Sequence, residues 1–388
     1  MTPASTQPHG AGLCGRTLDG RYHLEARIAR GGAADVYVGH DRRLGRRVAI
    51  KVALPPAGCL ECQICDGAGC GLIERVAAEA QVGARIDDPH VVPIHDVGVD
   101  RREGERPRPF LVMPRIYGRS LRARILDGGI PWRHAVTFGR HLLAGLAAIH
   151  EQGFLHGDLK PENCLICERS GREPYLRIID LGEARPLRGA PSASTGRRPD
   201  GTPHYAAPEQ ILGQELSVQA DLYAVGAILY EALCRRPPFV GTDEQVLRGH
   251  LDAIPRRPNE VSPDAAIPWR LEALVLAALS KDPRQRPASA AAFERALENA
   301  CPVAHDGFAG ELGQSDRICL GGTTRLGSAG FAGLSCSPTH AGAAQAQASL
   351  AAWTRFEYGR ARHEAATASA LNGAWSPLLM LMSLAPEE

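Results

Sequence analysis

The chain has 388 residues, and its 44 Lys and Arg residues nearly balance 43 Asp and Glu residues, giving a formal net charge of +1. This length suffices for one large domain with additional segments, and the balanced charge without a basic patch argues against a nucleic-acid partner. We expect no membrane span, because no run of about 18 apolar residues occurs, and a cytoplasmic location, because the polar N-terminus lacks the apolar core of a signal peptide.

We interpret the first 51 residues as a flexible lead-in, a glycine-containing loop and a short apolar strand. Residues 1–20 are polar, and we interpret them as the lead-in. Residues 28–38 (IARGGAADVYV) contain a glycine pair of the kind that lets backbone approach a phosphate closely, because glycine has no Cβ. Residues 48–51 (VAIK) predict an apolar strand that ends in Lys51. Taken alone, that lysine is more simply a solvated strand end.

A cysteine-rich insert at residues 57–71 follows this strand. Its four cysteines are spaced C-x₂-C-x₂-C-x₄-C, and part of it (CQICDGAG) resembles the zinc knuckles of J-domain co-chaperones. Reducing cytosol disfavours structural disulfides, so three interpretations stay open: a zinc site, a redox dithiol or a metal site shared with a second chain, and an inert loop. The candidate zinc ligands are Cys59, Cys62, Cys65 and Cys70.

The next segments predict one helix and one strand. Residues 74–86 (ERVAAEAQVGARI) are Ala-rich and contain no proline, which favours a helix. Residues 110–113 (FLVM) form a short apolar run typical of a buried strand, and residues 114–118 (PRIYG) read as a link to the rest of the chain.

The most informative stretch is residues 156–163 (HGDLKPEN), which is followed by the triplet DLG at residues 180–182. Phosphoryl transfer requires a carboxylate near the attacking hydroxyl, a cation on the moving group, and oxygen ligands for Mg²⁺. The first string resembles the catalytic loop of protein kinases, H-R-D-L-K-P-x-N, and the triplet resembles the D-F-G of that family. The chain is therefore similar to the bacterial eukaryotic-like serine/threonine protein kinases.

The resemblance implies an α+β fold with two lobes. It predicts a kinase domain over residues 21–300, in which an antiparallel N-lobe with one regulatory helix covers about 21–113. A mainly helical C-lobe then covers about 117–300. Residues 301–388 are rich in Ala, Gly, Ser and Thr, and we expect a largely disordered tail of unknown role.

The resemblance also implies the roles of the catalytic residues. Asp158 would orient the attacking hydroxyl and accept its proton, while Lys160 would stabilise the transferring phosphoryl group. Asn163 and Asp180 would hold Mg²⁺. Thr202, in the string GTPHYAAPE that matches the family's G-T-x-x-Y-x-A-P-E, would contact the catalytic Asp.

Nucleotide binding is likewise inferred from the resemblance. Lys51 would bridge the α and β phosphates of ATP, positioned by Glu79, which matches the family pattern better than Glu74 does. The predicted nucleotide-contacting residues are Ile28, Ala29, Gly31, Gly32, Val36, Ala49, Lys51, Met113, Arg115 and Ile116.

Two further consequences concern the scaffold and the activation segment. The family pattern pairs Arg286 with Glu209, and Asp221 braces the catalytic loop. Gly157 replaces the arginine that grips an activation-loop phosphate in many kinases, so phosphorylation of the hydroxyls between residues 183 and 202 is expected to have little effect.

The predicted function is ATP- and Mg²⁺-dependent phosphorylation of Ser or Thr in protein substrates. The alternative is a pseudokinase scaffold, favoured only by the incomplete glycine loop, in which Ala29 and Ala34 replace two glycines. A second alternative is a metal or redox sensor whose kinase domain is its output. The oligomeric state and the substrates stay open.

Overall fold

The computed structural model describes residues 12–55, 71–103, 105–169, 172–187 and 203–301. The strands are β1 Thr17–Leu18, β2 Tyr22–Arg30, β3 Ala34–Asp41, β4 Arg46–Ala53, β5 Asp96–Asp100, β6 Arg108–Pro114, β7 Gly118–Ser120, β8 Phe154–Leu155, β9 Cys164–Arg169, β10 Arg172–Ile178 and β11 Arg185–Pro186. The helices are α1 Leu72–Gly83, α2 Leu121–Leu126, α3 Trp132–Glu151, α4 Pro208–Ile211, α5 Val218–Cys234, α6 Asp243–Asp252, α7 Pro258–Val261, α8 Trp269–Ala278 and α9 Ala290–Ala300, with 3-10 turns η1 Pro161–Asn163, η2 Pro203–Tyr205, η3 Pro263–Ala265 and η4 Pro283–Gln285.

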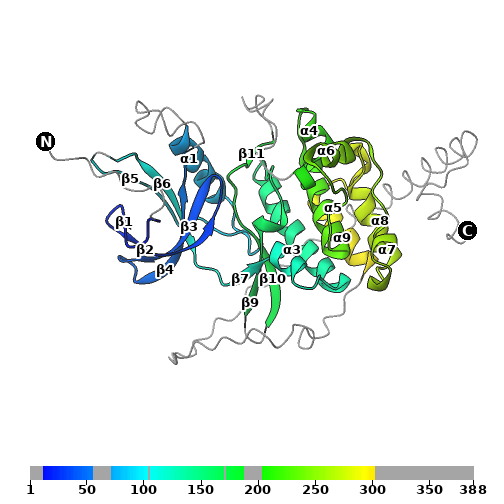
Figure 1. Ribbon diagram of the computed structural model, residues 1–388, viewed down its shortest axis with the longest axis horizontal. Helices are drawn as coiled ribbons and strands as arrows, with labels where there is room; N and C mark the ends of the chain where they lie inside the picture. The colour runs from blue at the N-terminus through cyan, green and yellow to red at the C-terminus, as the bar shows by residue number, and fades with distance from the viewer. Residues whose placement is uncertain (1–11, 56–70, 104, 170–171, 188–202, 302–388) are drawn as a thin grey trace, which may run out of the picture. The chain divides into compact units, whose positions relative to one another are not determined.

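The N-terminal part is a six-stranded antiparallel sheet with the order β1-β2-β3-β4-β6-β5 (Figure 1). Successive side chains of a strand point to opposite faces, and β4 shows this alternation clearly. Val48, Ile50 and Val52 enter one apolar core with residues of β2, β3 and β6. The intervening residues, which include Lys51, therefore face the other side of the sheet.

Helix α1 lies on the Lys51 side of the sheet. Val76 and Ala80 pack against Leu111, which is the cross-strand partner of Lys51. The helix differs from the predicted range of 74–86 at both ends, since it begins at residue 72 and ends at residue 83. Val82, inside the helix, and Ile86, beyond its end, both join the large core of the helical part.

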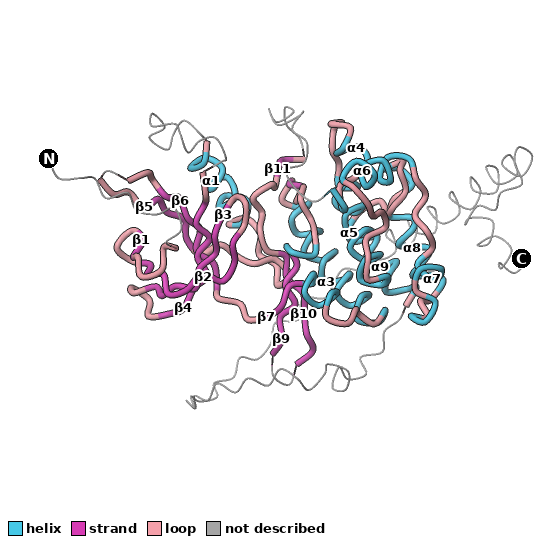
Figure 2. Tube along the Cα trace, in the orientation of Figure 1, coloured by secondary structure: helices cyan, strands magenta, loops and turns pink. Residues whose placement is uncertain are grey.

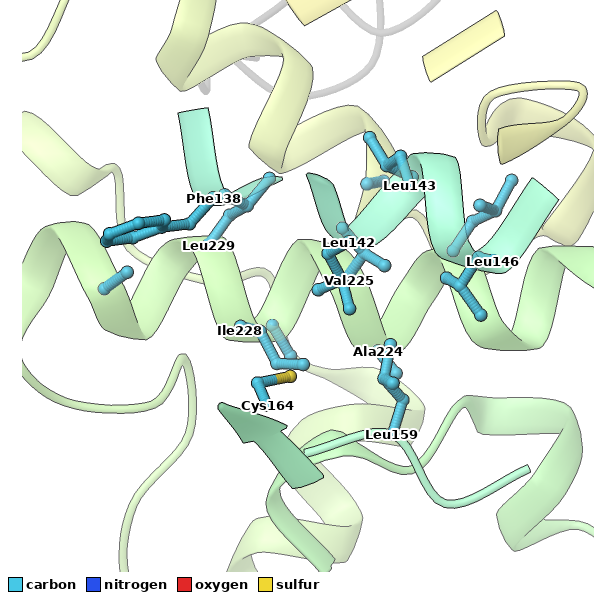
Figure 3. Packing of buried hydrophobic residues seen from close by; sticks show 14 of the residues in the cluster. Phe138, Leu142, Leu143, Leu146, Leu159, Cys164, Ala224, Val225, Ile228 and Leu229 are labelled. Carbon is cyan, nitrogen blue, oxygen red and sulfur yellow. The ribbon is translucent and has the colours of Figure 1, made fainter. Parts of the chain in front are cut away.

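The helical part is built around α5. Every residue of α5 from Ala220 to Cys234 is buried, as expected for a helix that is apolar on all sides. We call residues 156–163 the catalytic string. Figure 3 shows residues of α3 packed against α5, with Leu159 of the catalytic string and Cys164 of β9 in the same cluster. The catalytic string is thus anchored directly to the central helix.

Two small sheets frame the same string. β10, β9 and β7 form a three-stranded antiparallel sheet, and β8 pairs with β11 (Figure 2). Residues 156–163 therefore run from the end of β8 into the start of β9. Cys164 and Cys167 are buried on β9, where they pack as small apolar residues of a core strand.

One prediction about the N-terminus is wrong. Residues 12–20 belong to the fold and not to a flexible lead-in, because β1 pairs with β2 and Leu18 is fully buried in the sheet core. Arg16 also forms an ion pair of 2.6 Å with Asp100. A strand of two residues is too short to show a periodic pattern, so only its partners reveal it. Within the described residues, no helix has the length and apolarity that crossing a membrane requires.

A buried ion pair joins the segment before α5 to the segment after α8. The Arg286 guanidinium donates to both carboxylate oxygens of Glu209, at 2.6 and 2.8 Å, and its side chain is fully buried. It also donates to the carbonyl oxygens of Ser280 and Gln219. Such a pair makes only a modest net contribution to stability, but removing one partner leaves an uncompensated buried charge.

We therefore expect Arg286→Met to lower the free energy of unfolding by about 3–5 kcal/mol. Urea denaturation followed by circular dichroism would measure this loss. Arg284→Met is the matched control, because the Arg284 side chain is 90% exposed and should cost little. Equal effects of the two substitutions would contradict the assigned importance of the pair.

Candidate active site

Three charged side chains from separate segments meet on the α1 side of the sheet. Lys51 Nζ donates to both carboxylate oxygens of Glu79, at 2.7 and 3.0 Å, and to Asp180 Oδ1 at 2.6 Å. Glu79 is buried on α1, whereas Glu74 on the same helix is exposed. The structure thus places Glu79, and not Glu74, beside Lys51.

The electrostatics of this cluster favour a charged lysine. Burial opposes the ammonium form, but Asp180 and Glu79 outweigh it and raise the pKa of Lys51. Burial raises the pKa of Glu79, partly offset by Lys51, whereas the pKa of Asp180 is lowered because the nearby ammonium outweighs its own burial. A compact cation held between two carboxylates is suited to contact phosphate oxygens.

The string 156–163 presents a second group of polar side chains. Lys160 Nζ lies 2.5 Å from Asp158 Oδ2. Asn163 Nδ2 donates to the Asp158 carbonyl oxygen at 2.9 Å, so the Asn163 Oδ1 stays available as an acceptor. The backbone N–H of Ile179 donates to the Asn163 carbonyl at 2.8 Å, which brings Asn163 next to Asp180.

Asn163 and Asp180 together offer the oxygen ligands that Mg²⁺ prefers. Lys51 and the backbone N–H of Gly182 both contact Oδ1 of Asp180, so its Oδ2 is available for a cation. Asp180 also has a φ of 74°, a left-handed conformation that is uncommon outside glycine and often marks functional sites. The described residues contain no group of three or more His, Cys, Asp or Glu side chains arranged for a metal ion.

A carboxylate on α5 holds the start of the catalytic string. Asp221 accepts the backbone N–H groups of His156 and Gly157, at 2.9 and 3.0 Å, and the His150 Nε2–H at 2.8 Å. Burial would raise the pKa of Asp221, but these donors and the nearby histidines outweigh it and hold the pKa below its ordinary value. The carboxylate is therefore ionised in the folded protein at neutral pH.

Most of the predicted nucleotide-contacting residues share the face of Lys51. Val36 lies opposite Lys51 across β3 and β4, and Met113 lies opposite Ala49 across β6 and β4. Because Ala49 and Lys51 are two residues apart, all four point to one face. The remaining predicted residues follow at the ends of β2 and β6: Ile28, Ala29, Gly31, Gly32, Arg115 and Ile116.

The glycine pair makes a tight turn between β2 and β3. Gly31 N donates to the Ala34 carbonyl at 2.9 Å, and a Cβ at Gly31 would lie 2.8 Å from that oxygen. Only glycine fits this approach without displacing backbone. Ala29 lies on β2 opposite Val36, so its methyl group is accommodated within the sheet.

Gly157 has a φ of 80°, and a Cβ there would meet the Glu183 carbonyl oxygen at 2.8 Å and the Arg185 guanidinium at 3.3 Å. The Arg185 side chain thus places a guanidinium next to Gly157, which has no side chain of its own. Arg122 of α2 likewise contacts Glu162 in the catalytic string. Sequence reasoning missed both arginines, because their partners lie on other segments and leave no local pattern.

Several predicted residues lie outside the described part of the chain. They are Thr202, the four cysteines Cys59, Cys62, Cys65 and Cys70, the hydroxyl residues Ser192, Ser194 and Thr195, and the tail from residue 302 onward.

Comparison with known proteins gives a consistent result. The family model for the protein kinase domain matches residues 22–297. The serine/threonine-protein kinase pkn2 of Myxococcus xanthus is 34% identical over 333 residues, which are 83% of this chain and 38% of that protein. PknA and PknL of Mycobacterium tuberculosis are each 34% identical as well, over 73% and 72% of this chain. The chain spans between 38% and 66% of the length of these relatives.

The Asp221 carboxylate leads to a prediction about stability. We expect Asp221→Asn to lower the free energy of unfolding by about 3 kcal/mol, because an amide oxygen cannot accept all three donors. The pKa of Asp221 is lowered on folding, so its contribution is present above the ordinary Asp pKa and disappears as pH falls through the lowered value. The gap between wild type and variant should therefore be constant from about pH 5 to 8 and narrow below about pH 4.

Urea denaturation at a series of pH values would test both parts. Asp264→Asn, at an exposed position, is the control and should leave the stability nearly unchanged. A gap that widens at acid pH would contradict the ionised state assigned to Asp221.

Proposed function

Because the chain belongs to the protein kinase family, we propose that it transfers the γ-phosphoryl group of ATP to Ser or Thr hydroxyls of protein substrates in bacterial signal transduction. The observation that carries this proposal is the meeting of Lys51, Glu79 and Asp180, the last on a segment that is hydrogen-bonded to the one bearing the Asp158–Lys160 pair. These groups come from β4, from α1, and from the segments just before β9 and just after β10. They are distant in the sequence, and folding brings them together.

Asp158 acts on the attacking group. Its carboxylate orients the substrate hydroxyl and accepts the proton as the oxygen attacks the γ-phosphorus. Lys160 lies beside that carboxylate and neutralises charge on the transferring group. The backbone N–H bonds to Asp221 keep this short segment in place while the proton moves.

Lys51 acts on the nucleotide. Glu79 holds the ammonium from α1, and a bound nucleotide would offer phosphate oxygens to the side of Lys51 that now contacts Asp180. Asn163 Oδ1 and Asp180 Oδ2 would hold Mg²⁺, which supplies neutralisation of phosphate charge. The contact of Asp180 with Lys51 keeps its carboxylate ionised and therefore able to bind a cation.

The alternative role as a scaffold that binds nucleotide without transfer loses its main argument. It depended on the alanines in the glycine loop, yet the close approach in that turn occurs at Gly31, where the glycine is kept. Ala29 lies within β2, so its methyl group does not distort the turn.

We expect Asp158→Asn to lower the rate of phosphotransfer by about 10²–10⁴-fold and to leave ATP binding nearly unchanged, because Asp158 faces the hydroxyl and not the nucleotide. Transfer of radiolabelled phosphate to a generic basic protein substrate would measure the first quantity, and calorimetric titration with ATP the second. Lys51→Ala is the companion variant and should weaken both.

Activity of Asp158→Asn within about threefold of wild type would exclude its role as the base, since loss of a positioned base costs far more. Wild-type protein that binds ATP but transfers no phosphate to any substrate, itself included, would favour the scaffold.

We also propose that the cysteine-rich insert holds a metal ion. Support comes from the spacing of Cys59, Cys62, Cys65 and Cys70, which matches a closed four-thiolate zinc site, and from the reducing cytoplasm in which we place the chain. The insert ends directly before α1, whose Glu79 contacts Lys51. Metal binding in the insert would therefore bias the position of that helix.

Elemental analysis of protein purified without a polyhistidine tag should give about one Zn²⁺ per chain. Cys62→Ser combined with Cys65→Ser should remove the zinc and lower kinase activity, whereas Cys14→Ser, at an exposed cysteine outside the insert, should change neither. A zinc content near zero under reducing conditions would leave the redox and inert interpretations. About half an equivalent would indicate one ion shared by two chains.

A further inference from the structure

Arg122 lies at the centre of a group of acidic and phenolic side chains. From α2 its Nε donates to Glu162 Oε1 at 2.7 Å, and its two terminal nitrogens donate to Glu231 and to the Tyr205 hydroxyl. The Tyr205 hydroxyl in turn donates to the second oxygen of Glu231. These three acceptors come from η1, α5 and η2, and we call them the acidic pocket.

The acidic pocket has the charge and shape that suit a guanidinium. Glu231 is almost fully buried, whereas the Glu162 side chain is 46% exposed, so the pocket opens to solvent on the Glu162 side. Burial and the Glu231 charge raise the pKa of Tyr205, so the phenol stays protonated. Two carboxylates with one arginine leave a net negative charge, and the planar fork of a guanidinium satisfies all three acceptors at once.

The proposed function places the substrate hydroxyl at Asp158, and the acidic pocket lies within reach of that position. Glu162 is four residues from Asp158, so their Cα atoms are at most about 14 Å apart. A peptide in extended conformation advances about 3.3 Å per residue. When its hydroxyl lies at Asp158, a long side chain a few positions away can therefore reach the pocket.

We infer that Arg122 determines substrate specificity: it fills an arginine-sized acidic pocket beside the phosphoacceptor site and so prevents the chain from selecting substrates with arginine near the target hydroxyl. This inference rests on the proposed function. The contrasting interpretation makes Arg122 a strut between α2 and α5. A strut contributes to stability, but its removal gives no new preference for a cationic ligand.

The experiment compares wild type with Arg122→Ala on two serine peptides that differ only in having arginine or alanine at the positions flanking the serine. Wild type should show KM values within about twofold for the two peptides. Arg122→Ala should show a KM for the arginine peptide that is at least about tenfold lower than its KM for the alanine peptide, with kcat little changed. A charge-assisted contact of this kind easily reaches that factor. Arg119→Ala, which removes an exposed arginine paired with Asp127 next to α2, is the charge-matched control and should behave as wild type.

A second measurement requires no kinase activity. Methylguanidinium, at about ten times its dissociation constant, should raise the melting temperature of Arg122→Ala by about 2–4 °C and leave wild type and Arg119→Ala unchanged. If wild type transfers no phosphate, the proposed function fails while this measurement still tests the pocket. Arg122→Gln, which keeps a hydrogen-bonding side chain, replaces the alanine variant in both measurements if that variant does not fold.

The inference is overturned if the variant keeps the peptide preference of wild type and if methylguanidinium stabilises it no more than wild type. Arg122 would then be a strut.

Discussion

The geometry of the site depends on one buried carboxylate, Asp221. It lies on a helix that is buried on every side, and a charge at that position is tolerable only because it accepts two backbone N–H groups and one imidazole N–H. The same bonds fix the backbone of His156 and Gly157, directly before Asp158. The helical core therefore determines where the proposed base lies, and the apolar contacts of Leu159 with that core hold the segment from its other side.

A second charge cluster connects this rigid core to the sheet. Lys51 comes from β4, Glu79 from α1, and Asp180 from the segment after β10, so the cluster exists only when all three segments are in place. Helix α1 packs on the sheet through Val76, Ala80 and Leu111, and its Val82 joins the core of the helical part. Its N-terminal neighbour is the cysteine-rich insert. A change in that insert would therefore act on the Lys51 contact through α1.

Two arginines lie beside the catalytic string. Arg122 neutralises part of the charge of Glu162 and Glu231, and Arg185 lies against Gly157. The positive φ of Gly157 disfavours a side chain there, and the nearby cation comes from Arg185 of another segment. The surroundings of the catalytic string are thus shaped by residues outside it.

The sequence by itself determined the family resemblance and the α+β two-lobed architecture, and it predicted Lys51, Asp158 and Asp180 as site residues, because these features depend on residue types at short, local spacings. It placed helix α1 within three residues at each end, but it missed β1, whose two residues are defined only by pairing with β2. Only the tertiary structure decided the partners of Arg122, which lie 40, 83 and 109 positions away. A guanidinium that bridges separate segments follows no helical or strand period, so its role becomes visible only when folding brings those segments together.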